Sequence, residues 1–169
     1  MRIFISIALA FLAVSANAFD SSAWDEKRRM HLVEAERLQG EYAKAVERTT
    51  EPAENVTVPF DTFEDGSVKT LVFAKRAQYF LDSGIVYAEG VTLKKLKKDG
   101  SLDARLDAES CVIDRYTKSG WAEGQTVLVQ GKTTFKGEGV YFSSPDGYVK
   151  VSKKSDIVSE DLSFGGLRP

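Results

Sequence analysis

The sequence contains little of the chemistry on which many enzymes depend. Among its 169 residues there is one cysteine, Cys111, and one histidine, His31. A single cysteine excludes a disulfide within the chain, and these two residues cannot complete a four-ligand zinc site of the Cys/His type. The acidic residues alternate with apolar ones along the expected strands, so we interpret them as solvated side chains. We therefore expect no enzyme activity, no catalytic residue, no bound metal and no cofactor.

The chain also lacks a strong excess of charge of either sign. It has 23 Lys plus Arg against 25 Asp plus Glu, a net charge of −2. Non-specific binding to nucleic acid depends on many cations, so we expect no nucleic-acid partner. One dense basic cluster comprises Lys94, Lys95, Lys97 and Lys98. Its lysines either protect an exposed hairpin from aggregation or bind anionic lipid head groups.

Only one long apolar run is present, at residues 3–14. It is shorter than the ~20 residues that a membrane-spanning helix needs. Arg2 precedes the run, and residues 16–18 have the Ala-x-Ala pattern of a cleavage site. Residues 1–18 therefore read as a cleavable signal peptide, which predicts secretion of a soluble mature protein. An uncleaved membrane anchor is the alternative.

Residues 22–48 contain one glycine and no proline, and they predict one long helix. With a short linker, this helix forms a segment at residues 19–54. Along it, a 4-3 spacing picks out Trp24, Arg28, His31, Ala35, Leu38, Tyr42 and Ala45. This row either packs against the rest of the same chain or associates with another copy as a coiled coil.

From Val56 onward, apolar residues alternate with polar ones, and glycine-containing turns recur, as in antiparallel sheets. The sequence also repeats with an offset of 34 residues. Residues 65–67 (Asp-Gly-Ser) recur at 99–101, and residues 88–90 (Ala-Glu-Gly) recur at 122–124. We interpret Ala-Glu-Gly as a turn rather than as the site of a catalytic carboxylate. Each unit then consists of three short strands joined by two turns.

One face of the expected strands is apolar. Such a face either forms an ordinary core or stays partly open and holds a lipid chain, and the same residue types serve both purposes. The candidates for lining a lipid groove are Val68, Val72, Leu102, Leu106, Ile113, Phe135, Val140, Phe142, Val149 and Val151.

Each repeat places Ala-x-x-Ala or Ala-x-x-Cys before an aromatic-Ala-Glu-Gly segment and an apolar strand. The closing segment, residues 137–151, reads Gly-Glu-Gly-Val-Tyr-Phe-Ser-Ser-Pro-Asp-Gly-Tyr-Val-Lys-Val. Over residues 55–160 this pattern resembles the LptA/LptC (OstA-like) family of periplasmic lipopolysaccharide-transport proteins. The resemblance implies a mainly β fold: an antiparallel, incompletely closed β-jellyroll of ~30–34-residue repeats, here preceded by the helix.

The resemblance further implies an apolar groove for the acyl chains of lipopolysaccharide, a periplasmic location, and edge-to-edge strand pairing with other jellyroll proteins. The mature protein would reach membranes only through such partners. The chain would then carry or bridge lipopolysaccharide between the inner and outer membranes. The alternative is a secreted structural or protein-interaction domain that oligomerises through its helix. The helix fits neither branch of the family, and residues 161–169 are expected to form a flexible tail.

Overall fold

A computed structural model of the chain describes residues 21–48 and 51–159. The predicted signal peptide (1–18) and tail (161–169) lie outside the described residues. The elements are α1 (Ser21–Glu47), β1 (Ala53–Thr62), β2 (Val68–Phe80), β3 (Ile85–Leu96), β4 (Leu102–Asp114), β5 (Ser119–Gln130), β6 (Thr133–Ser143) and β7 (Tyr148–Ser159). The predicted long helix followed by a mainly β segment is confirmed, and the sheet begins at Ala53, inside the segment expected to be helix and linker.

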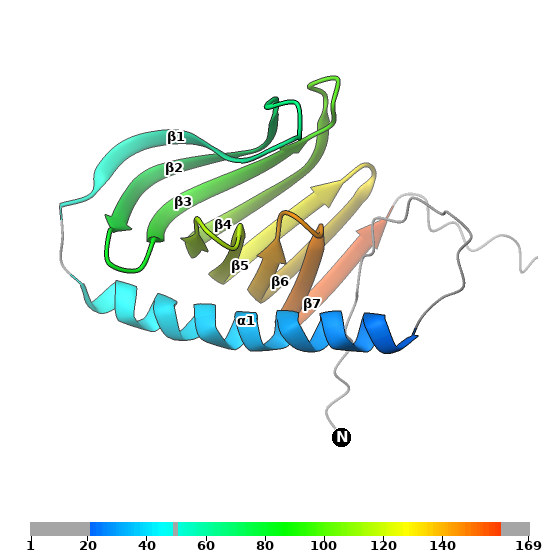
Figure 1. The fold of residues 1–169 in the computed structure, drawn as a ribbon, viewed down its shortest axis with the longest axis horizontal. Helices are drawn as coiled ribbons and strands as arrows, with labels where there is room; N and C mark the ends of the chain where they lie inside the picture. The colour runs from blue at the N-terminus through cyan, green and yellow to red at the C-terminus, as the bar shows by residue number, and fades with distance from the viewer. Residues whose placement is uncertain (1–20, 49–50, 160–169) are drawn as a thin grey trace, which may run out of the picture.

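The strands form one seven-stranded antiparallel sheet in the order of the sequence, from β1 to β7. In the described part of the chain β1 and β7 do not pair with each other, so the sheet is open. Figure 1 shows that the strands arch strongly, with β1 and β2 curving over the rest of the sheet. The predicted open, antiparallel architecture is confirmed.

The 34-residue repeat corresponds to a pair of long strands, first β2 with β3 and then β4 with β5. The repeated Asp-Gly-Ser segments have the same geometry. Gly66 and Gly100 both have φ of 81°, a region in which glycine is favoured. In each turn a backbone N–H, of Phe63 or of Lys97, donates a 2.8 Å hydrogen bond to the carbonyl of the serine four residues later.

The Ala-Glu-Gly segments are not turns, and the expected three-strand unit is wrong. Gly90 lies inside β3 with φ of 59°, and Gly124 lies inside β5 with φ of 76°. At Gly124 the pairing with β4 shifts between Ala108 and Ser110, as in a β-bulge. A bulge bends a strand without ending it, so each repeat has two long strands. Glycine at positive φ serves turns and bulges alike, and the sequence does not distinguish them.

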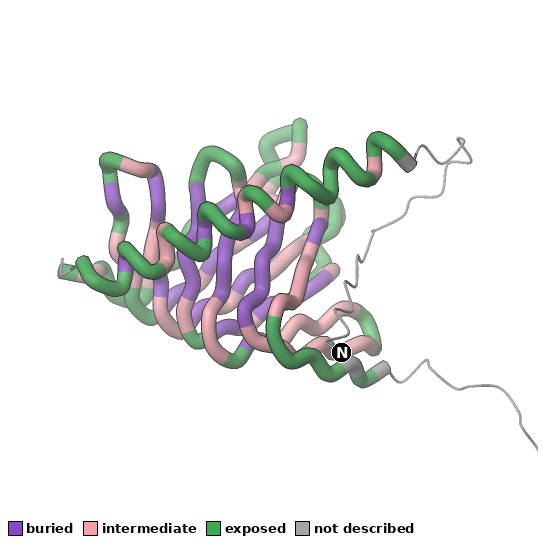
Figure 2. The backbone as a smooth tube through the Cα atoms, turned by 90° about the horizontal axis from the view of Figure 1, so that it is seen from below, coloured by how far each residue is buried: buried purple, intermediate pink, exposed green. Residues whose placement is uncertain are grey.

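Helix α1 lies across one face of the sheet and packs against β3, β4 and β5 (Figure 2). Its buried contact residues are His31, Ala35, Leu38 and Ala45. They pack with Phe80, Ile85, Val112, Trp121, Tyr141 and Tyr148 of the sheet. The row with 4-3 spacing therefore docks on its own domain, and these four side chains are not available for a coiled coil. No helix in residues 21–48 or 51–159 combines the length and hydropathy needed to cross a bilayer.

His31 is part of this helix contact. Its ring stacks on Tyr148 with 4.2 Å between the ring centroids, and Nδ1 lies 3.0 Å from the hydroxyl of Tyr141. Burial lowers the pKa of His31 below its ordinary value, although Asp146 opposes this effect. The imidazole is therefore neutral at pH 7 and acts as a packed side chain of the helix contact.

Candidate functional site

The face of the sheet opposite α1 is lined by rows of apolar residues that run across the strands. Cross-strand partners in one row are Val58, Val72, Leu93, Leu106, Leu128 and Phe135. A parallel row has smaller side chains at Ala77, Ala88, Cys111 and Ala122. This row is hollow at Ala77 and Ala88, which line a cavity, whereas Cys111 and Ala122 are fully buried in the core. Burial raises the pKa of the Cys111 thiol to about 12, so this thiol is protonated and unreactive at neutral pH.

A cavity of about 610 Å³ occupies this hollow over the β1–β4 half of the sheet. Its floor is apolar and buried, and it includes Val72, Ala88 and Ile113. Its rim includes the exposed residues Tyr79 and Arg115. The volume lies within the ~300–1,000 Å³ that is typical of pockets for small molecules.

The β1–β2 hairpin folds over the same face and touches turns at the opposite ends of other strands. Ser144 Oγ donates a 2.9 Å hydrogen bond to Asp61 Oδ2, and it lies 2.9 Å from Thr70 Oγ1. Lys118 Nζ donates a 2.8 Å hydrogen bond to the carbonyl of Phe60. We call these five residues the clasp. The clasp closes the groove at one place while the sheet remains open at its edges.

Phe60 divides the groove into two chambers. Its buried side chain lines the cavity of about 610 Å³ and also a second cavity of about 80 Å³. The smaller cavity is lined by Leu93, Leu106 and Phe142, among others. The Phe142 ring lies over Gly120, where an added methyl group would overlap it. The groove thus continues beneath the clasp, with the Phe60 side chain between its two chambers.

Most of the predicted groove residues come together on this face. Those in its buried core, or packed against it, are Val72, Leu106, Ile113, Val140, Phe142, Val149 and Val151. Phe135 is half-buried and continues the row that contains Leu106 and Leu128. Val68 is half-buried at the start of β2, and Leu102 is 53% exposed at the start of β4. These two residues lie beside the hairpin turns, away from the larger cavity.

The structure does not gather the predicted head-group ligands into one patch. They are Lys94, Lys95, Lys97 and Lys98. Lys95 Nζ lies 3.2 Å from Asp103, and Lys98 Nζ lies 3.9 Å from Asp65, so each has an acidic partner. Lys94 lies on the other face of β3, with Nζ 4.8 Å from the centroid of an aromatic ring. Lys97 belongs to the turn between β3 and β4.

The sequence reasoning missed the cations that the structure places at the larger cavity, Arg115 and Lys118. Both belong to the β4–β5 turn, for which the sequence analysis predicted no function. The repeat carried a usable signal, because an offset of 34 residues aligns Arg115 with Leu81 and Lys118 with Gly84. The second unit therefore has two cations where the first has none.

The described residues define a class of fold: a mainly β protein with an open, seven-stranded antiparallel sheet and one long N-terminal helix. Within them, no group of three or more His, Cys, Asp or Glu side chains is arranged to hold a metal ion. No protein-family model matches the chain, and no curated protein is significantly similar to it in sequence. What the site does must therefore be argued from its geometry.

Proposed function

We propose that this protein is a non-enzymatic, periplasmic lipid carrier of the LptA/LptC-like type, and that it holds acyl chains of lipopolysaccharide in its groove. The observation that carries the proposal is the cavity of about 610 Å³ on the face of the sheet that α1 leaves open. Its buried floor consists of aliphatic side chains, which match the chemistry of an acyl chain.

The energetics favour such a ligand. Burial of apolar surface contributes ~0.8 kcal/mol per methylene, so a chain of ten methylenes gains roughly 8 kcal/mol before the losses of immobilisation. The small side chains of Ala74, Ala77 and Ala88 line the cavity and leave room for an acyl chain over β2 and β3. In this proposal the acyl chain slides along the groove, because no directional contact fixes its methylenes.

The two edge strands are the proposed contacts to partner proteins. In the described structure β1 pairs only with β2, and β7 pairs only with β6. A further jellyroll protein could add its own edge strand and extend the groove by β-augmentation. Each edge strand contains a non-glycine residue at positive φ, Asn55 or Lys154. Such irregularities limit indiscriminate pairing of exposed edges.

Two matched valine substitutions test the lipid site. Val58 lines the larger cavity from β1 and is 44% exposed, so Val58→Glu should fold. Val158 is 60% exposed on β7, where its partner Thr134 lies on the face opposite the groove. Val158→Glu therefore makes the same change in the other edge strand but on the other face.

The measurement is native mass spectrometry of the secreted protein purified gently from a Gram-negative periplasm, followed by displacement of a fluorescent fatty-acid probe by lipopolysaccharide. We expect a lipid A adduct on the wild type, about tenfold weaker lipid binding by Val58→Glu, and no change in Val158→Glu. A wild type that neither carries nor binds lipid would overturn the proposal. Equal binding by both variants would place any lipid outside this groove.

A further inference from the structure

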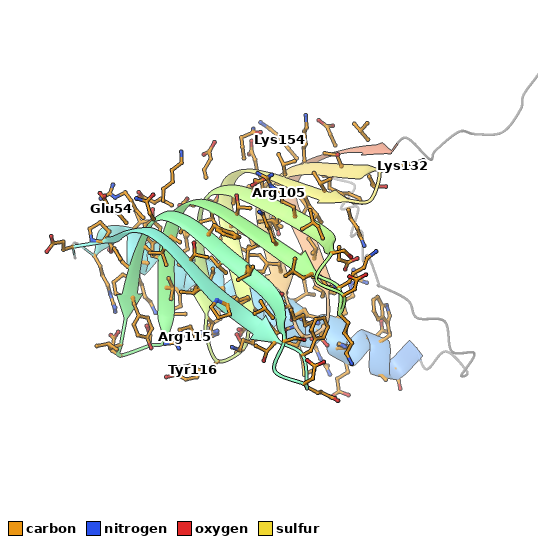
Figure 3. All side chains as sticks on the ribbon, turned by 90° about the horizontal axis from the view of Figure 1, so that it is seen from above. Glu54, Arg105, Arg115, Tyr116, Lys132 and Lys154 are labelled. Atoms are coloured by element: carbon orange, nitrogen blue, oxygen red, sulfur yellow. The ribbon has the colours of Figure 1, made fainter. Side chains whose placement is uncertain are left out.

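The rim of the larger cavity has a cationic end. Arg115 and Lys118, from the β4–β5 turn, both line this cavity. The guanidinium carbon of Arg115 lies 5.1 Å from the centroid of the Tyr79 ring, which holds the cation against the end of β2. Figure 3 shows Arg115 beside Tyr116 at one end of the sheet, well away from Lys132.

These two cations differ from the other basic groups near the groove. Within residues 21–48 and 51–159, neither Arg115 nor Lys118 forms an ion pair with a carboxylate, and Lys118 instead donates to the carbonyl of Phe60. In contrast, Arg105 binds Asp107 at 2.8 Å, and Lys95 and Lys98 each have an acidic partner. Glu51 lines the same cavity without pairing to either cation.

We infer that Arg115 and Lys118 bind the phosphate of a phosphorylated lipid whose acyl chain occupies the larger cavity. The inference rests on the proposed function and adds the position of the head group. A guanidinium presents parallel N–H donors that match phosphate oxygens, and an ammonium adds a point charge. The aliphatic floor accepts the acyl chain, so the ligand has one orientation: the head group lies at the β4–β5 turn and the acyl chain lies along the floor at Val72 and Ala88.

The position of the head group also follows from the contrast with the lysine hairpin at residues 94–98. That hairpin lies at the other ends of the strands, next to the β3–β4 turn. Its paired lysines would have to give up their carboxylates before binding a phosphate, whereas Arg115 is exposed and would only have to leave its contact with Tyr79.

The test uses the full secreted chain and two single-chain probes of equal tail length, dodecyl phosphate and the uncharged dodecyl maltoside, each below its micelle concentration. Arg115→Gln is the main variant, because Lys118 also belongs to the clasp and its loss would disturb the fold. Arg76→Gln is the matched control, since Arg76 is an exposed cation on β2 that pairs with Glu89 and lines neither cavity of the groove. Thermal unfolding verifies that each variant is folded.

We expect Arg115→Gln to weaken dodecyl phosphate binding by about tenfold or more, with dodecyl maltoside binding unchanged and Arg76→Gln without effect on either probe. Arg115→Lys should restore part of the loss. If Arg115→Gln affects both probes equally or neither, the head-group assignment is overturned while the lipid groove stands. Dodecanoate bound as tightly as dodecyl phosphate, with the same dependence on Arg115, would overturn the assignment to phosphate. If neither probe binds the wild type, the proposed function fails, and the head-group site fails with it.

Discussion

The hydroxyl of Ser144, in the turn between β6 and β7, donates a 2.9 Å hydrogen bond to the carboxylate of Asp61 in β1. The two residues are 83 positions apart in the sequence and lie near opposite edges of the sheet. They meet only because the sheet is coiled strongly enough for its first hairpin to reach its last turn. The contact belongs to the clasp, which sets how far the groove is closed.

Loss of the Ser144 hydroxyl should loosen the clasp. Burial of Asp61 raises its pKa, but the hydrogen bonds from Lys69 and Ser144 outweigh burial and hold the pKa below its ordinary value. We expect Ser144→Ala to lower the free energy of unfolding by about 1 kcal/mol and to raise the pKa of Asp61. Urea unfolding and amide hydrogen exchange measure the effect, which should concentrate in β1. Ser83→Ala, in the β2–β3 turn, is the control. If the amides of β1 were as well protected from hydrogen exchange in Ser144→Ala as in the wild type, this contact would not hold the clasp.

Removal of the Phe60 ring should join the two chambers of the groove. We expect Phe60→Ala to lower the free energy of unfolding by roughly 3 kcal/mol, because it removes a buried aromatic side chain. It should also shift the preference of the groove toward longer acyl chains. Competition between 12-carbon and 16-carbon fatty acids for a fluorescent probe measures that preference. If chain-length preference stayed at the wild-type value, Phe60 would not be the constriction.

Two glycines provide opposite tests of packing. At Gly120 an added methyl group would overlap the Phe142 ring, whereas at Gly40 in α1 it would meet nothing within 4 Å. We expect Gly120→Ala to lower the free energy of unfolding by about 1–3 kcal/mol through overpacking. Gly40→Ala should raise it by roughly 0.5–1 kcal/mol, because alanine favours the helix. Urea titration measures both, and changes of the same sign would contradict the packing described here.

Glu34 makes the docking of α1 sensitive to acid. The hydrogen bond from Arg37 outweighs burial, and with Thr117 and Ser119 it lowers the pKa of Glu34 from 4.5 to about 2. A depressed carboxylate pKa contributes stability that is fully present above pH 4.5 and is lost as the pH falls toward 2. Glu34→Gln should therefore lower stability at neutral pH and flatten its decline over that range. Unfolding at a series of pH values measures this decline, and Glu36→Gln on the exposed side of α1 is the control. If Glu34→Gln lost stability in acid as the wild type does, Glu34 would not be the cause of the acid sensitivity.

Local patterns predicted local structure well. The absence of breakers predicted a helix over residues 22–48, and the structure has Ser21–Glu47. Asp65-Gly66 and Asp99-Gly100 predicted hairpin turns, which are present because each glycine supplies the positive φ that the turn needs. The Ala-Glu-Gly segments misled the prediction, since a glycine bulge and a glycine turn differ only in what the chain does several residues later.

The candidate site could be predicted only in part. The period-two pattern identified groove residues such as Val72 and Leu106, because alternation assigns side chains to faces whatever the sheet then does. The cationic rim was missed, since Arg115 and Lys118 become neighbours of the cavity only when the sheet curls and Phe60 reaches the β4–β5 turn. Charge density in the sequence pointed instead to Lys95 and Lys98, which the structure places beside carboxylates.

The order of helix and strands, the Asp-Gly turns and one apolar face of the sheet thus follow from short-range patterns, since each depends on the conformational preferences of a few adjacent residues. The structure buries apolar residues on both faces, however, and the pattern does not say which of them the helix covers. That choice depends on contacts far apart in the chain, such as His31 on Tyr148. The strong coiling of the sheet, which brings Ser144 to Asp61, likewise arises only when all seven strands are assembled and their twists add together.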